Sequence, residues 1–185
     1  MEKLIRIPRN SSATMQALQR LIASGHFYWC AGTVPRNRLA AFIEKWESRG
    51  LALRADAPAR SYRKKKEQAN HSLVITPDWR EAADVDPVRW FITGTVGIGS
   101  IVTMAHPPAP VFDARRVAGR INFGDYELAL LPKAWMDADG VKQKDTTWTW
   151  RLCSARFREW EAHVIERAKQ RDRTGLETAF AGLAA

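Results

Sequence analysis

The chain has 185 residues and a formal net charge of +9, with 45% hydrophobic and 26% charged residues. This composition is typical of a folded globular protein and excludes a chain that is disordered throughout; the length allows one sizeable core or two small units that share one. No apolar run approaches the ~18 residues of a membrane span, and the first residues lack the apolar segment of a secretory signal. We therefore expect a cytoplasmic protein.

The positive charge is confined to one part of the chain. Residues 1–76 contain fourteen Lys and Arg against five Asp and Glu, whereas residues 77–185 contain fifteen of each. We therefore expect a basic nucleic-acid-binding half over residues 1–76 and a neutral, Trp-rich half over residues 77–185, although the two could form one continuous domain. Such a local excess of cations is typical of a surface that binds a polyanion. An acidic partner protein or an anionic membrane surface would also suit this charge, but the partner we expect is nucleic acid, with no membrane.

The first fifty residues predict alternating strands and helices. Residues 4–7 are a short apolar run, and residues 11–24 repeat apolar side chains at helical spacing, with Gly25 as the stop. Residues 26–34 are aromatic and β-prone, which favours a strand, and residues 35–49 return to helical spacing. The apolar stripe of this second helix is Leu39, Phe42, Ile43 and Trp46. Another face of the same helix carries Arg38, Lys45 and Arg49.

The densest positive charge lies in the run Arg60-Ser61-Tyr62-Arg63-Lys64-Lys65-Lys66. Residues 51–54 and 72–76 are interpreted as strands, so we expect the run to form a mobile wing or β-arm between them. Such an arm would bring cations to phosphates and a tyrosine ring to a base or sugar. The order helix, strand, helix and hairpin over residues 11–76 partly resembles a winged helix, but it lacks that fold's third helix.

The second half predicts a mostly antiparallel sheet and a long C-terminal helix, which makes the fold α+β. An acidic segment bounded by Pro77 and Pro87 is the expected boundary. The expected strands are residues 88–93 and 100–104 around a glycine-rich turn, residues 120–123 and 126–131 around Gly124-Asp125, and residues 147–152. The final helix begins at Ser154, with an apolar stripe of Phe157, Trp160, Val164 and Ala168.

The sequence offers only weak signals for catalysis. The two cysteines and four histidines lie at no metal-ligand spacing, so we expect no metal, no cofactor and two reduced, buried thiols. Asp125 and Glu127 could share one strand face, as the carboxylates of a metal-dependent nuclease do, but no Lys follows at the usual spacing. A metal-independent ribonuclease is the alternative. In it His71 would be the general base beside the basic arm, with His26, Tyr62 and Arg63 in supporting roles.

The leading hypothesis is a non-catalytic nucleic-acid-binding protein that contacts the phosphate backbone through the basic helix and the basic arm. Its candidate contact residues are Arg36, Arg38, Lys45, Arg49, Arg54, Arg60, Tyr62, Arg63, Lys64, Lys65 and Lys66. The neutral half would supply a core and could bind a protein partner, as in a subunit of a nucleoprotein complex. DNA and RNA both stay open as ligands. The richness in Arg, Ala and Trp would suit a bacterial or mobile-element setting.

Overall fold

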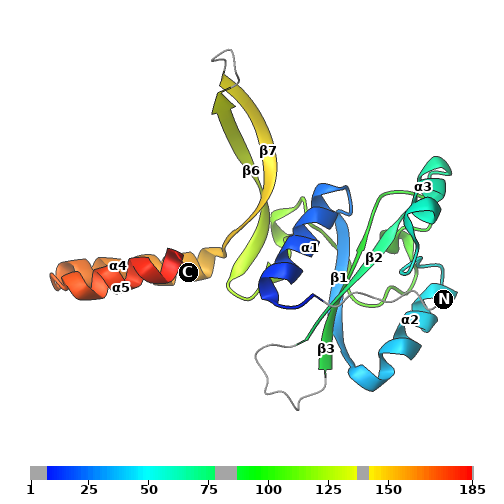
Figure 1. Ribbon diagram of the computed structural model, residues 1–185, viewed down its shortest axis with the longest axis horizontal. Helices are drawn as coiled ribbons and strands as arrows, with labels where there is room; N and C mark the ends of the chain where they lie inside the picture. Colours follow the sequence, from blue (N-terminus) through cyan, green and yellow to red (C-terminus); the bar gives the residue numbers. More distant parts are fainter. Residues whose placement is uncertain (1–7, 78–86, 137–141, 185) are drawn as a thin grey trace. The chain divides into compact units, whose positions relative to one another are not determined.

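The computed structural model describes residues 8–77, 87–136 and 142–184, and it has the α+β architecture that the sequence predicts (Figure 1). The chain divides into two compact units, Met1–Ile121 with Leu128–Trp150, and Asn122–Glu127 with Arg151–Ala185. In chain order the helices are α1 (Ser11–Ala23), α2 (Leu39–Ser48), α3 (Ala57–Lys65), α4 (Ser154–Lys169) and α5 (Arg173–Ala184). The strands are β1 (Tyr28–Pro35), β2 (His71–Pro77), β3 (Pro87–Gly94), β4 (Phe112–Asp113), β5 (Asn122–Phe123), β6 (Tyr126–Met136) and β7 (Lys142–Leu152).

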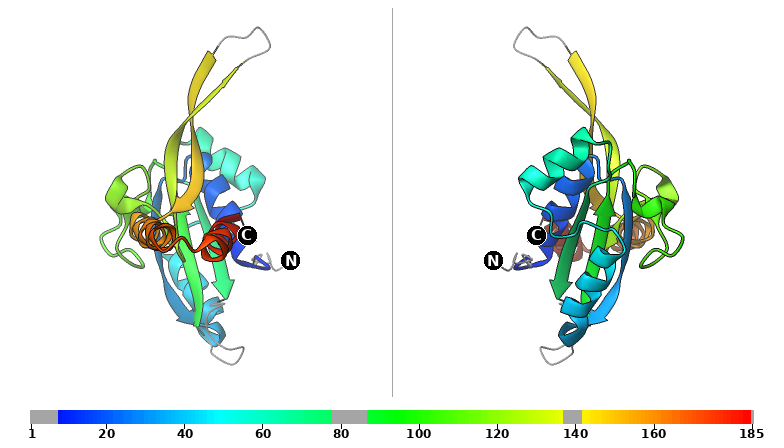
Figure 2. Two further views of the ribbon diagram at one scale, coloured as in Figure 1. Left: turned by 90° about the vertical axis from the view of Figure 1, so that its left-hand side faces the viewer. Right: turned by 90° about the vertical axis from the view of Figure 1, so that its right-hand side faces the viewer.

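A four-stranded antiparallel sheet with the order β2-β3-β1-β4 lies at the centre of the first unit. In its register, Cys30 of β1 and Leu73 of β2 both pair with Ile92 of β3. Successive side chains of a strand point to opposite faces, so these three share one face, and Trp29 and Phe91 belong to the other. Helix α1 covers one side of the sheet, and α2 and α3 lie on the opposite side (Figures 1 and 2).

The face of the sheet that carries Cys30 and Ile92 forms a hydrophobic core with α2. Trp46 of α2 is buried against it, and the ring of Phe42 lies 4.9 Å from that of Trp90 of β3. Leu51 and Leu53 complete this core from the segment after α2. The packing of Phe42 and Trp46 on the sheet confirms the apolar stripe that was expected for this helix. Burial raises the pKa of the Cys30 thiol to about 12, so this cysteine is a packing residue rather than a nucleophile.

Helix α1 and the part of β7 around Trp148 and Trp150 lie on the other side of the sheet. Leu18 and Ile22 of α1 are fully buried, and Asn10 caps the helix by accepting from the Ala13 N–H. The side-chain amide of Gln19 donates to the carbonyl of Trp148 (2.7 Å), and the indole N–H of Trp150 donates to the carbonyl of Met15 (3.0 Å). These bonds fix β7 to α1 within the first unit.

Two of the expected strands are wrong. Residues 51–54 form no strand, because their alternating leucines fill the α2 core and the Arg54 N–H bonds to the Glu47 carboxylate (3.0 Å). Residues 100–104 instead contain the 3₁₀ turn Ile101–Thr103, in which the Thr103 hydroxyl bonds to the Ser100 carbonyl (2.8 Å). Ser and Thr side chains that bond to nearby backbone compete with strand pairing.

The sheet combines strands from both sides of residue 76. Strand β3 pairs with β1 on one side and with β2 on the other, so the central strand comes from the half of the chain that was expected to be neutral. Residues 78–86, which hold most of the expected boundary segment, lie outside the described residues. The division into compact units falls near residues 121–128 and 150.

The second unit consists of the short β5–β6 turn, the end of β7, and the two helices α4 and α5. The hairpin expected around Gly124-Asp125 is confirmed, with Phe123 paired to Tyr126. The long C-terminal helix is confirmed as α4, and the weak helix expected in the tail is the twelve-residue α5. Helix α4 has no buried residue within the described part, and its aromatic side chains pack on one another and on Phe180 of α5.

Candidate nucleic-acid interface

Residues 60–65 of the cationic run are helical and Lys66 is the C-cap, which corrects the expected mobile arm. Asp56 caps the first turn of α3 by accepting from the Ala59 N–H (3.0 Å), and Pro58 occupies that turn, where a missing N–H is tolerated. The lysines stand in the last turn, where cations interact favourably with the helix dipole. The winged-helix likeness is therefore not confirmed, since the segment assigned to its hairpin is a helix.

Arg63 holds α3 to the rest of the first unit. Its Nε and Nη2 both donate to the carbonyl of Ala69, at 2.9 and 2.7 Å. One turn earlier, the carbonyl of Arg60 accepts from the side-chain amide of Asn70 (3.1 Å). These contacts tie the helix to the segment that leads into β2. The Arg63 side chain is therefore a structural residue rather than a free phosphate ligand, whereas Arg60 takes part through its backbone carbonyl and has a half-buried side chain.

A glycine-rich loop supports the end of α3. The Ile98 N–H donates to the Glu67 carbonyl (2.8 Å), and the Ala69 N–H donates to the Ile98 carbonyl (2.9 Å). Gly97 has a φ of 139°, and a Cβ at this position would lie 2.6 Å from the Glu67 carbonyl oxygen. Only glycine allows this approach without strain. The glycine-rich segment was expected to be a hairpin turn. In the structure its backbone hydrogen bonds hold the C-terminal end of the basic helix in place.

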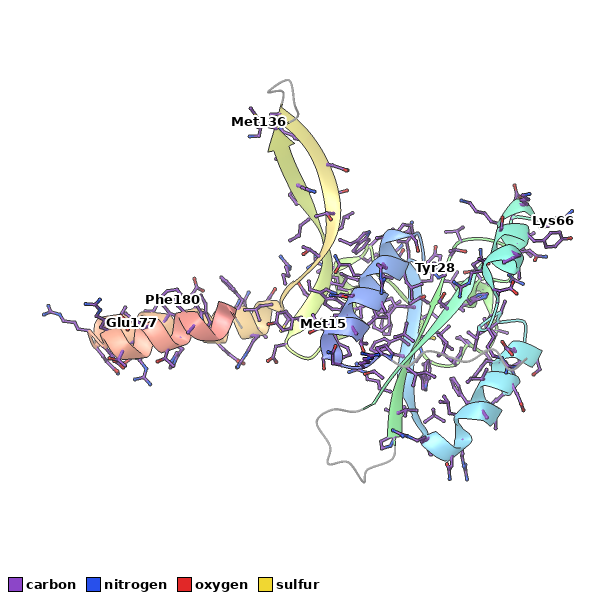
Figure 3. All side chains as sticks on the ribbon, viewed as in Figure 1. Met15, Tyr28, Lys66, Met136, Glu177 and Phe180 are labelled. Carbon is purple, nitrogen blue, oxygen red and sulfur yellow. The ribbon has the colours of Figure 1, made fainter. Side chains whose placement is uncertain are left out.

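The remaining side chains of the run are exposed. Lys64, Lys65 and Lys66 are exposed, and Figure 3 shows Lys66 at the end of the helix. Tyr62 is 61% exposed, and the Lys66 ammonium lies 6.0 Å from the centre of its ring. Of the candidate residues in this run, these four are free to meet a ligand without breaking a contact that fixes the fold.

Helix α2 presents a second group of cations on the same side of the sheet. The Arg49 guanidinium lies 4.9 Å and the Lys45 ammonium 5.4 Å from the centre of the buried Trp46 ring. The two charged groups therefore lie over the indole ring as cation–π contacts, and both side chains are exposed overall. Arg36 and Arg38 are exposed just before the helix. Arg54 belongs to the fold instead, because its guanidinium pairs with the Glu47 carboxylate.

The histidines that a ribonuclease would need are buried. The His71 side chain is fully enclosed, and its Nδ1 accepts from the Ala52 N–H (3.4 Å). Burial, reinforced by the charges of Arg63 and His26, lowers the pKa of His71 to about 4. His26 is buried too, and its Nδ1 lies 3.3 Å from the Thr93 hydroxyl. A buried neutral imidazole cannot reach a ribose hydroxyl in this conformation, so the geometry argues against His71 as a general base.

The carboxylates considered for a nuclease metal bond to arginines. Glu127 accepts from the Arg151 Nε (2.7 Å), and Asp125 lies 3.6 Å from the Arg156 Nε. Among residues 8–77, 87–136 and 142–184, no cluster of His, Cys, Asp and Glu could hold a metal ion. In the same described ranges, no helix is long and apolar enough to cross a bilayer.

Comparison with known proteins adds no functional assignment. No protein-family model matches the chain, and no curated protein or solved structure is significantly similar to it. The arrangement of the side chains themselves therefore carries the functional argument.

Two features of the interface were missed at the sequence level. One is the division of the basic residues into exposed and structural groups, because the acceptor for Arg63 is a backbone carbonyl six residues away. The other is the helical state of the run, for which a signal was present. Asp56 before Ala57-Pro58-Ala59 is an N-cap followed by an early proline, a pattern that predicts a helix start.

A substitution of Arg63 tests the division of the basic residues into exposed and structural groups. The Arg63→Gln variant should lose about 2 kcal/mol of unfolding free energy, because a charged donor that bonds a carbonyl twice is removed from a half-buried site. The matched control Lys64→Gln removes the same charge from the next, exposed position and should change stability little. Urea denaturation of both variants measures the difference. Equal stability of the two variants would show that the Ala69 contact does not hold the helix.

Proposed function

We propose that this protein binds nucleic acid by contacting its phosphate backbone with two short basic helices on one side of a four-stranded sheet. The supporting observation is the set of exposed cations on α2 and α3. Residues 36–67 contain ten Lys and Arg against four Asp and Glu, which is six of the nine net charges of the chain. The exposed cations of the proposed surface are Arg36, Arg38, Lys45, Arg49, Lys64, Lys65 and Lys66.

The way these cations are held suits a phosphate-binding surface. Lys45 and Arg49 rest on Trp46, and the lysines of α3 stand on a helix that Arg63 and the glycine-rich loop keep in place. Cations on fixed elements lose less conformational entropy on binding than cations on a mobile arm. A polyanion spanning both helices would therefore meet a prepared surface.

A titration at two salt concentrations tests this proposal. Labelled single-stranded DNA, single-stranded RNA and duplex DNA are titrated with the protein by fluorescence anisotropy at ~50 mM and ~200 mM salt, with EDTA present. If six cations each neutralise one phosphate, affinity should fall roughly 10³-fold between these concentrations. Affinity that is indifferent to salt, or an absence of binding, would refute the proposal. A denaturing gel of the same samples should show intact strands, and cut RNA would instead favour a ribonuclease.

A protein partner on the second unit is an accompanying hypothesis, in which the chain is one subunit of a nucleoprotein complex. Helix α4 has no buried residue in the described part of the chain, and Phe157, Ile165 and Phe180 are each about half exposed. Exposed apolar side chains in such numbers are typical of a surface that another protein covers. Sedimentation of the chain with and without nucleic acid would reveal self-association, the simplest form of such an assembly.

A further inference from the structure

The C-terminal end of α3 exposes apolar as well as cationic groups. Tyr62 is 61% exposed, and the glycine-rich loop contributes Val96 and Ile98, which are 64% and 69% exposed. Backbone bonds from Ile98 to Glu67 and from Ala69 to Ile98 hold this loop beside the last turn of the helix. We call Tyr62, Lys66, Val96 and Ile98 the α3 end surface. This end of the helix therefore combines an exposed aromatic ring beside Lys66 with exposed aliphatic side chains of the adjoining loop.

This composition fits unstacked bases better than the outside of a duplex. A duplex presents phosphates and sugars on its exterior, and its bases are stacked within, so an exposed tyrosine ring has little to contact there. A single strand offers base faces that stack on aromatic side chains while its phosphates lie against cations. Lys66, 6.0 Å from the ring centre of Tyr62, would place a cation close to a phosphate that adjoins the stacked base.

The two ends of α3 also differ from those of a helix that reads the major groove. Such recognition helices contact base edges with residues of their N-terminal part. Here the N-terminal part is Asp56 followed by Ala57-Pro58-Ala59, which offers one carboxylate, itself engaged as the N-cap, and small apolar side chains. The three lysines and the ring lie in the other half, where the glycine-rich loop adjoins the helix, and the only cation near the start is the half-buried Arg60.

The α3 end surface is held in place before any ligand arrives. The two bonds from Arg63 to Ala69, the Asp56 cap and the close contact of Gly97 with Glu67 fix both ends of the helix. A ring on a fixed helix keeps most of its stacking energy on binding, because the backbone needs no further ordering.

We propose that the preferred ligand is a single-stranded nucleic acid, with a base stacked on Tyr62 and neighbouring phosphates on Lys64, Lys65 and Lys66. The proposal rests on the nucleic-acid-binding function proposed above and names its ligand class. RNA and DNA share the chemistry that this surface recognises, since ring stacking and phosphate pairing involve neither the 2′-hydroxyl nor the thymine methyl group. Both kinds of strand therefore belong in the test.

The test compares Tyr62→Ala, Tyr62→Phe and the wild-type chain. Each is titrated with labelled oligo(dT), oligo(rU) and a duplex of the same length, about 20 nucleotides, which spans one such site. The wild type should bind one or both single strands at least about 10-fold more tightly than the duplex. Tyr62→Ala should weaken single-strand binding by about 5- to 100-fold and leave duplex binding unchanged, whereas Tyr62→Phe, which keeps the ring, should match the wild type. Tyr126→Ala, at a 42% exposed tyrosine of the second unit, is the matched control and should change neither.

The outcomes separate the inference from the function on which it rests. Salt-sensitive binding with a preference for duplex, or with no effect of Tyr62→Ala, overturns the single-strand proposal and leaves nucleic-acid binding intact. An absence of binding to all three ligands overturns both. Vesicles of phosphatidylserine and phosphatidylcholine are titrated as a fourth ligand, because cations beside exposed apolar groups also suit an anionic membrane. Binding to the vesicles without binding to any strand would overturn both proposals.

Discussion

Replacing Lys64, Lys65 and Lys66 together by Gln should weaken nucleic-acid binding by about 100-fold at ~0.1 M salt. Each lysine that neutralises a phosphate of a single strand contributes about 0.7 to the slope of log affinity against log salt, so the slope should become shallower by about 2. Glutamine has nearly the helix propensity of lysine, so α3 should persist. The loss of favourable charge at the helix end should lower the unfolding free energy by about 1 kcal/mol.

The matched control moves the same change in charge to other exposed positions. Arg158→Gln, Lys169→Gln and Lys144→Gln together also remove three positive charges, from α4 and β7. If the long-range field of the net charge were responsible for binding, both triple variants would lose affinity to the same degree. The α3 variant should lose far more. An unchanged salt slope in the α3 variant would move the binding surface away from this helix.

Acidification from about pH 7.5 to pH 4 should remove roughly 3 kcal/mol of stability through His71 alone. Burial lowers the pKa of His71 from 6.5 to about 4, with smaller contributions from the charges of Arg63 and His26. Between these two values the unfolded chain binds a proton that the folded chain does not, so the unfolding free energy rises with pH. The stability that depends on a neutral His71 is fully present above about pH 6.5 and is lost as the pH falls towards 4. Burial shifts the pKa of His26 in the same direction.

Urea denaturation at several pH values between 4 and 7.5 measures this effect, with a variant to isolate it. His71→Asn keeps an acceptor for the Ala52 N–H but has no titrating ring, so its stability should depend less steeply on pH. His106→Asn, at an exposed histidine, serves as the control and should follow the wild-type curve. If all three proteins had the same pH dependence, His71 would not be buried in its neutral form.

Most secondary-structure elements were predictable because their residues have strong local patterns. The spacing of Leu18 and Ile22 predicted the buried face of α1, and the strict alternation around Trp148 and Trp150 predicted residues 147–152 of β7 but not the earlier part of that strand. The errors occurred where an alternating or apolar segment had no strand to pair with. Leu51 and Leu53 alternate as a strand would, but they fill a space left beside Trp46, and periodicity alone cannot reveal that space.

The candidate site was predictable as a place in the chain but not as a surface. The run from Arg60 to Lys66 was identified by charge alone, and it lies in the proposed interface. Its division into structural and exposed members was not predictable, because it depends on which side chain meets the Ala69 carbonyl. The role assigned to His71 depended on its position beside the run in the sequence, whereas its burial depends on the sheet and the segments packed over it.

The sequence by itself determined the α+β class, most of the helices and strands, and the location of the net charge, because these follow from residue types and spacings within short segments. The tertiary structure alone decided that α3 is braced by the glycine-rich loop, that Arg63 is a structural residue, and that Tyr62 and the lysines face solvent. These properties depend on contacts that residue types and spacing do not specify: the loop contact joins Glu67 to the distant Ile98, and the Arg63 contact depends on how the chain turns between α3 and β2. Such contacts determine which polar groups find a partner inside the fold and which remain available to a ligand.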